Sequence, residues 1–148
     1  MLTQMEADKL MQVLKSINDP GLFLFPNHHG QAKLDVVSKE SKDRFIVTVN
    51  RKSCRITKCS YQERYASGEN EILLRLDLDS GSHSNPDDTV VPSPHLHVYR
   101  EGLGDSWALP VPEFFRVTDE LSEWLIQFLE YCRIVNVQAL AIPKELGI

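Results

Sequence analysis

The sequence predicts an α+β fold with residues 1–148 in a single domain: a mostly antiparallel sheet of four to five strands, with two helices packed on one of its faces. Two observations favour this class. Apolar residues recur at helical spacing in the segments 3–17 and 118–133, near the two ends of the chain. Between them, short segments that alternate or are rich in β-branched residues are separated by turns containing Gly, Pro and Asn. A chain of 148 residues buries roughly 70% of its unfolded surface, which is enough for one core.

The first helix is predicted over residues 3–17. Thr3 and Glu6 have the spacing of a capping box, in which each side chain accepts a hydrogen bond from a backbone N–H of the first turn. Pro20 ends the helix, because proline cannot continue the hydrogen-bond ladder. The apolar stripe of this helix is Ala7, Leu10, Met11, Leu14 and Ile17.

Strands are predicted at 33–38, 44–50, 54–65, 71–79 and 95–100, with a short buried extended piece at 22–26, a turn at 27–30 and a hairpin loop at 66–70. Successive side chains of a strand point to opposite faces. In 71–79, Ile72, Leu74, Leu76 and Leu78 share one face, so Arg75 and Asp77 lie on the other. In 95–100, His95, His97 and Tyr99 share a face, with Leu96 and Val98 opposite.

The segment 80–94 is predicted to be a long loop that covers the polar face of these strands and carries His83. Loops of this length in compact domains are usually functional or disordered. After it, Thr118 is expected to cap the last helix, 118–133, and residues 135–142 to form a short final strand.

Composition limits the function. The net charge of −5 argues against broad, non-specific binding to nucleic acid. Residues 33–64 nevertheless carry nine Lys/Arg against four Asp/Glu, which indicates either a solvated pair of strands or a basic face for an anionic ligand. An acidic exterior could also suit a basic protein partner. No signal peptide or membrane span is visible, and three cysteines without framework spacing suit a reducing compartment, so a cytoplasmic protein is expected. No phosphate-binding glycine motif is present, and no cofactor is expected.

The candidate catalytic site combines residues of the two polar strand faces with the loop above them. Two or three imidazoles can exchange protons near pH 7, an arginine can hold a phosphate, and a carboxylate can orient a histidine. Metal-independent cleavage of RNA needs these groups: a base for the 2′-hydroxyl, an acid for the leaving oxygen, and a cation for the developing charge. The predicted catalytic residues are His95, His97, His83, Arg75, Asp77 and Tyr99.

Metal binding is the alternative chemistry. Histidines at positions i and i+2 of a strand lie on one side and can bind one ion, so His95 and His97 would be ligands, with His83 or Asp77 completing the site. The run from His95 to Glu101 also fits the opening of a cupin motif, but no histidine follows His97 to supply the last ligand of that motif.

Two resemblances rest on these residues. The pattern Tyr61-Gln62-x-Arg64, Leu74 to Asp77, His83-x-Asn85-Pro86-Asp87 and Pro94 to Gly102, with Asp105 and Trp107, resembles a bacterial and phage family of unknown function. More distantly, Arg75/Asp77, His83 and Pro94-His95-x-His97 are similar to the core of TumE-type toxins, which are proposed ribonucleases paired with an antitoxin. In this sequence Leu76 stands where those toxins have a tyrosine, and the loop before the Pro-His element is longer.

Two functions from different classes are therefore expected. The first is a toxin-like endoribonuclease that binds RNA through Arg64 and Tyr61 and has an antitoxin or host protein as a partner. The second is a non-catalytic protein-binding module of phage or mobile-element origin, which would use exposed aromatic residues, since aromatic side chains anchor interfaces. The aromatic residues expected on the surface are Tyr61, Tyr65, Tyr99 and Trp107.

Overall fold

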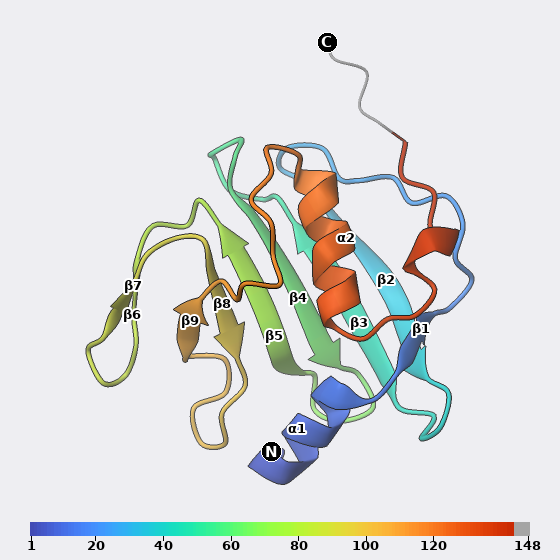
Figure 1. The fold of residues 1–148 in the computed structure, drawn as a ribbon, viewed down its shortest axis with the longest axis horizontal. Helices are drawn as coiled ribbons and strands as arrows, with labels where there is room; N and C mark the ends of the chain where they lie inside the picture. Colours follow the sequence, from blue (N-terminus) through green and yellow to red (C-terminus); the bar gives the residue numbers. More distant parts are fainter. Residues whose placement is uncertain (144–148) are drawn as a thin grey trace.

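The computed structural model describes residues 1–143, and within them a seven-stranded antiparallel sheet carries one long helix on its front (Figure 1). The strand order is β1-β2-β3-β4-β5-β8-β9, and β6 and β7 form a separate small hairpin. The helical elements are α1 (Gln4–Gln12), α2 (Leu121–Tyr131) and a 3₁₀ turn, η1 (Val137–Ala139). The strands are β1 (Lys15–Ile17), β2 (Gln31–Ser38), β3 (Arg44–Asn50), β4 (Cys59–Tyr65), β5 (Glu71–Leu78), β6 (His83–Ser84), β7 (Val90–Val91), β8 (His95–Val98) and β9 (Ala108–Pro110).

The α+β class is confirmed, but the predicted number of strands was too low. Residues 15–17, assigned to the first helix, form edge strand β1, and residues 108–110, assigned to a connection, form the other edge, β9. Each has three residues, which is too short for a pattern of alternation to stand out. The expected 80–94 loop contains the β6–β7 hairpin.

The first helix is shorter than predicted. The capping box of Thr3 and Glu6 is present, but α1 ends at Gln12. Beyond it, the backbone of Lys15 bonds to Arg133 and Val135, and Leu14 is 60% exposed instead of buried. Tertiary pairing with the C-terminal segment therefore replaces the last turns that the apolar spacing suggested.

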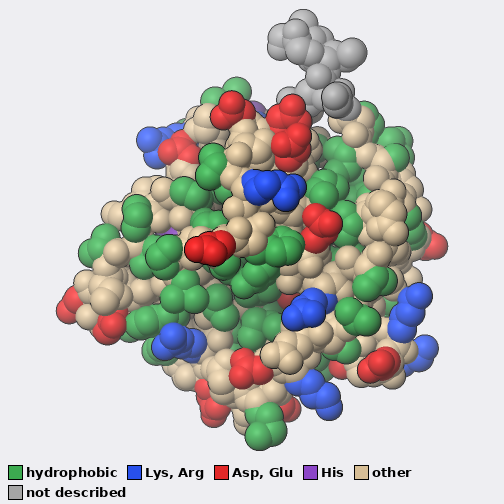
Figure 2. Space-filling view, in the orientation of Figure 1, with side chains coloured by type: hydrophobic (Ala, Val, Ile, Leu, Met, Phe, Trp, Pro, Cys, Tyr) green, Lys and Arg blue, Asp and Glu red, His purple; other side chains and the backbone are tan. Residues whose placement is uncertain are grey.

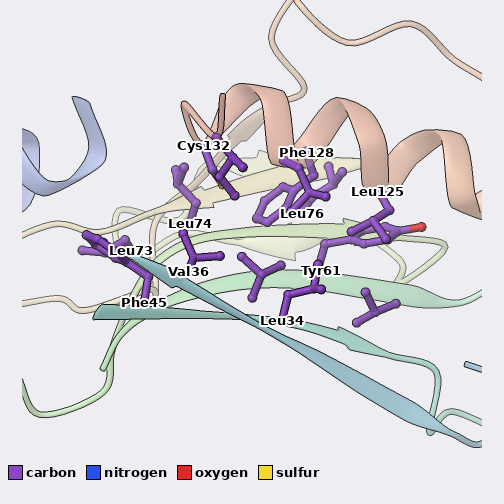
Figure 3. Packing of buried hydrophobic residues seen from close by; sticks show 14 of the residues in the cluster. Leu34, Val36, Phe45, Tyr61, Leu73, Leu74, Leu76, Leu125, Phe128 and Cys132 are labelled. Atoms are coloured by element: carbon purple, nitrogen blue, oxygen red, sulfur yellow. The ribbon is translucent and has the colours of Figure 1, made fainter. Parts of the chain in front are cut away.

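Only α2 lies over a face of the sheet, whereas α1 lies beyond one end of it (Figure 1), so the expectation of both helices on one face was wrong. The core forms between α2 and the sheet, where side chains of both interdigitate (Figure 3). Burial of these side chains supplies the main driving force for folding. The labelled members include Leu34, Val36, Phe45, Tyr61, Leu74 and Leu76 from the sheet, with Leu125, Phe128 and Cys132 from α2 or its end.

Three further local expectations were wrong. In 22–26 only Phe23 and Pro26 are buried, while Leu22 and Leu24 are largely exposed. The residue at the N-terminal cap of α2 is Glu120, without a side-chain cap bond, and the hydroxyl of Thr118 donates to Glu123 instead. The segment 135–142 forms η1 and extended chain instead of a strand, and the side chain of Asn136 bonds to the edge of β1. Neither helix of the described chain has the length and apolar character needed to cross a membrane.

Candidate functional site

The site lies on the face of β5 and β8 that points away from α2. The two strands pair with Arg75 opposite His97 and Asp77 opposite His95, so these four side chains share one face. Leu74, Leu76 and Leu96 alternate with them and are buried in the core under α2. Figure 2, which shows the α2 side of the molecule, accordingly displays almost no histidine surface. The placement of these four side chains follows the alternation predicted from the sequence.

Asp77 joins the groups of this face. Its Oδ2 lies 3.5 Å from Nε2 of His95 and 3.3 Å from Nε2 of His97, and its Oδ1 accepts a hydrogen bond of 3.1 Å from Nε of Arg75. One carboxylate therefore contacts two imidazoles and a guanidinium. Such a contact fixes ring orientation, because each imidazole has only two nitrogens with which to satisfy its surroundings.

His97 is held from both sides. Its Nδ1 lies 2.7 Å from the carbonyl of Asp105 and must donate a proton to it, because a carbonyl oxygen only accepts. In the neutral ring, Nε2 then offers its lone pair to Nη2 of Arg75, 3.0 Å away. In the charged ring, Nε2 donates to Asp77. Arg75 also forms an ion pair of 2.5 Å with the side chain of Asp105, so the loop that follows β8 completes the site.

His83 enters from β6 and covers the two strand histidines. Its ring centroid lies 4.6 Å from that of His97 and 5.8 Å from that of His95, and its Nε2 donates to the carbonyl of Ser106 over 2.8 Å. We call Arg75, Asp77, His83, His95, His97 and Asp105 the histidine cluster. His95 and His97 are 2% and 1% exposed, so in this conformation the β6–β7 hairpin shields them from solvent.

Asn85 holds the hairpin in place. Its side-chain amide donates to the carbonyl of Ala108 over 2.9 Å and accepts from the N–H of the same residue over 2.7 Å. These two bonds are those that a further strand would make to the outer edge of β9. The sequence indicated only a turn at Asn85-Pro86-Asp87-Asp88, and nothing local in it points to the edge of β9.

Burial sets the protonation of the cluster. Burial lowers the pKa of His95, and the neighbouring Asp77 carboxylate offsets this effect only in part. Burial alone raises the pKa of Asp77, but the hydrogen bond from His97 and the charge of Arg75 together bring it below its usual value. Asp77 is therefore a carboxylate, and His95 favours the neutral form, with a lone pair available. The backbone of Pro92 also acts against burial and raises the pKa of His95, and among the described residues the buried Nδ1 of this ring makes no hydrogen bond to a side chain.

Tyr99 and Tyr61 do not belong to the site. Leu73 forms a bulge in β5, β8 ends at Val98, and Tyr99 turns into the core, where its hydroxyl donates to the carbonyl of Leu2. Tyr61 is buried under α2 and donates to the carbonyl of Leu121. The expectations that Tyr99 is catalytic and that Tyr61 binds RNA at the surface were therefore wrong. Arg64 lies on the same face as the cluster, one strand away on β4.

The same atoms could hold a metal ion. Asp77, His95 and His97 each offer one ligand atom, and these atoms lie within 4.8 Å of one another. Two ligands about 2.1 Å from a tetrahedral zinc ion lie about 3.4 Å apart, close to the 3.3 and 3.5 Å found around Asp77. The bond from Nδ1 of His97 to Asp105 would orient this ligand, as outer-shell bonds do in metal sites. Arg75 competes for the same lone pair of His97, and His83 is not in the ligand group.

A cavity lies outside the histidine cluster, near the start of α2. About 750 Å³ opens at the N-terminal end of α2, lined among others by Phe25, Ile56, Val117 and Trp124. No member of the histidine cluster lines it. The histidine cluster and this cavity are therefore separate.

The chain belongs to a family of unknown function (DUF6978), whose model matches residues 2–134. That match covers both strands of the site, the β6–β7 hairpin and α2. Comparison with curated proteins finds no match, and comparison with solved structures finds none.

Proposed function

We propose that this protein cleaves RNA without a metal ion, using the histidine cluster. The observation that carries the proposal is the convergence of three imidazoles, a guanidinium and a carboxylate on one sheet face, with one histidine favouring the neutral state. The similarity of Arg75/Asp77, His83 and Pro94-His95-x-His97 to the core of TumE-type toxins supports the same chemistry.

Each residue has a role that its contacts support. Arg75, whose side chain is 26% exposed, is the cation that a phosphate from solvent meets first. His95 is the general base, since burial keeps the ring neutral and the sheet register places it opposite Asp77, which orients it. His97 in its charged form is the general acid, because its Nε2 is adjacent to the guanidinium that would hold the phosphate. Asp77 orients both rings.

In the reaction, the base accepts the proton of the ribose 2′-hydroxyl as the oxygen attacks phosphorus. The bond from phosphorus to the 5′-oxygen breaks, and that oxygen takes the proton of the acid. The products are a 2′,3′-cyclic phosphate and a free 5′-hydroxyl. Because the rings of His83 and His97 are 4.6 Å apart, no phosphate fits between them, so the substrate must displace the β6–β7 hairpin.

The test is cleavage of purified RNA in buffer containing EDTA. Wild-type protein should yield products with cyclic phosphate ends, and His95→Ala should lower the rate by about 10²- to 10⁴-fold, the usual contribution of a general base. Produced in cells without a partner, the wild type should arrest growth and His95→Ala should relieve the arrest. The proposal is wrong if total RNA stays intact and the two proteins permit equal growth.

A second candidate is metal-assisted chemistry at Asp77, His95 and His97, which the spacing of 3.3 and 3.5 Å around Asp77 favours. Metal analysis of the purified protein distinguishes the two. About one zinc or iron per chain, lost in His97→Ala together with activity, would favour this second candidate. Activity that persists in EDTA favours the first.

A third function, a protein-binding module without catalysis, keeps two of its four motivating aromatic residues, Tyr65 and Trp107, half-buried at the surface. Trp107 is half-buried and lies under the guanidinium of Arg100, 4.1 Å from the ring centroid. Figure 2 shows apolar side chains gathered beside α2, over the part of the sheet toward β8 and β9. Recovery of a stoichiometric partner from host lysate, with intact RNA in the cleavage test, would favour this module.

A further inference from the structure

The sheet face opposite α2 carries rows of polar side chains that lead to the histidine cluster. We call this surface the open face, because neither α1 nor α2 packs on it in the described chain. Strand register places Lys33 of β2 beside Thr48 of β3, then Gln62 of β4, then Arg75 of β5. Arg75 in turn lies opposite His97. This row leads from the exposed Lys33 to the proposed acid, with the side chain of Thr48 buried between Lys33 and Gln62.

A second row runs parallel to the first. It passes from Gln31 to Asn50 and Ser60 and ends at Asp77 and His95. Before Asp77, this row contains only uncharged amide and hydroxyl side chains. Such groups donate hydrogen bonds to phosphate and ribose oxygens without requiring a particular base.

The charge of the open face suits an anion. Lys33, Arg44 and Arg64 all lie on it, and none of them has an ion-pair partner among residues 1–143. The two acids of the cluster, Asp77 and Asp105, are both engaged by Arg75, and Asp35 is an acid that shares this face with Lys33 on β2. The basic excess of the segment 33–64 thus includes cations on the same sheet face as the site.

We propose that single-stranded RNA binds along the open face and enters the histidine cluster by the row from Lys33 to Arg75. This inference rests on the proposed function, since it specifies the substrate of that site. Three strand spacings of about 4.8 Å separate β2 from β5, or about 14 Å in all. That length equals about four nucleotides at the roughly 3.4 Å rise of a stacked strand. Before the histidines of the cluster, neither row contains an aromatic side chain, so binding along the rows is to phosphate and sugar, and sequence preference is weak.

The test is binding, measured apart from cleavage. A fluorescein-labelled single-stranded RNA of about 12 nucleotides, within the usual range of site sizes, is titrated with His95→Ala protein by fluorescence anisotropy. In this background Lys33→Glu should weaken binding at least fivefold, and Arg64→Gln should weaken it less. With three phosphate contacts, a plot of the logarithm of the affinity against the logarithm of the salt concentration should have a slope of about −2. In Lys33→Glu the magnitude of this slope should be smaller by about 0.7.

The matched control is Arg116→Glu, which reverses a charge at an exposed position just before α2, away from both rows. It should bind RNA as the parent does. If Lys33→Glu and Arg116→Glu bind the RNA with equal affinity, the inference is wrong. It is also wrong if the protein binds polyglutamate and does not bind the RNA. If RNA binds with this pattern but the wild type does not cleave it, the RNA path stands and the proposed cleavage fails. If the wild type cleaves RNA and Lys33→Glu binds and cleaves normally, cleavage stands and the path fails.

Discussion

Lys15 and Glu63 form an ion pair of 3.1 Å that is fully buried between the sheet and the end of α2. The ammonium also donates to the carbonyl of Cys132 over 3.0 Å and lies 4.8 Å from the centroid of the Phe45 ring. Burial raises the pKa of Glu63, and the charge of Lys15 counteracts this only in part. A pair desolvated to this degree stabilises the fold only while both partners are present.

Removing one partner should therefore cost more than removing both. Lys15→Met or Glu63→Leu alone leaves an uncompensated buried group and should lower the free energy of unfolding by about 3–5 kcal/mol. The double variant replaces the pair with apolar side chains of similar size and should recover most of that loss. Urea unfolding of the four proteins measures the coupling. Additive losses would show that the two side chains act independently.

His95 gives the stability of the protein a dependence on pH. Its pKa is lowered in the folded state by burial, against a value of about 6.5 in an unfolded chain. Between these two values the unfolded chain binds more protons, so stability rises with pH and is lost as pH falls below about 6.5. The charged or titratable groups facing His95 are Asp77, His97, His83 and Arg75.

The expected result is a melting temperature that decreases from pH 6.5 to pH 5, with a shallower decrease in His95→Asn. Asp77 contributes in a different range, since its lowered pKa confines its effect to pH values below about 3.8. Differential scanning fluorimetry in EDTA measures both slopes. Replacing the exposed His29 by Asn is the control and should leave the slope as in the wild type. A slope unchanged in His95→Asn would contradict the prediction.

At the scale of elements, the side chain of an asparagine closes each edge of the sheet. Asn85 pairs with the N–H and C=O of Ala108 in β9, and Asn136 does the same with Ile17 in β1, at 2.7 and 3.1 Å. In both cases a side-chain amide takes the place of a neighbouring strand. The backbone groups of short edge strands are thereby satisfied without a further element.

Replacing either asparagine by alanine should leave an N–H and a C=O without partners, one pair at each edge. The expected loss is about 1–3 kcal/mol in the free energy of unfolding, with faster hydrogen exchange at the N–H of Ala108 for Asn85→Ala and of Ile17 for Asn136→Ala. Gln138→Ala, at an exposed position of η1, is the control. Equal exchange at these two amides in variant and wild type would mean that other groups protect the edges.

Prediction from sequence succeeded where a strand has enough residues for its period to be read. The period of two in the predicted strands 71–79 and 95–100 indicated one face for Arg75, Asp77, His95 and His97, and the structure pairs β5 with β8 directly. It failed at Tyr99, because a bulge at Leu73 and the end of β8 break the alternation. The catalytic roles of these residues stay predictions.

Contacts between segments that are distant in the sequence could not be predicted from local patterns. Leu14 and Ile17 continue the helical spacing of α1, yet the chain there pairs with residues 133–136 more than a hundred positions away. The Asp105 carbonyl that orients His97 comes from a connection with no regular period. Such contacts depend on how the strands of the whole sheet are arranged, and a short segment of the sequence does not contain this information.

At the scale of the whole molecule, the capped edges bear on its assembly. An edge strand with free N–H and C=O groups can pair with another chain, and proteins prevent this with short strands, proline or covering segments. β9 combines all three: three residues, Pro110 at its end, and the hairpin held by Asn85. The covering hairpin is also the element that shields the histidines, so one anchor serves both the edge and the site.

Freeing this edge should therefore make the protein associate. In the double variant Asn85→Ala/Pro110→Thr, Ala108 loses its side-chain partner and residue 110 gains an N–H, which presents an open edge to a second chain. Size-exclusion chromatography with light scattering should show a mass that rises with concentration in this variant, compared with the wild type at the same concentrations. Asn136→Ala is informative as a comparison, because β1 is also paired to residues 133–135 by backbone bonds and should not open as far. If the Asn85→Ala/Pro110→Thr protein has the same mass as the wild type at all concentrations, the hairpin covers the edge of β9 by contacts other than those of Asn85. A substrate that displaces the hairpin would then have to break those contacts as well.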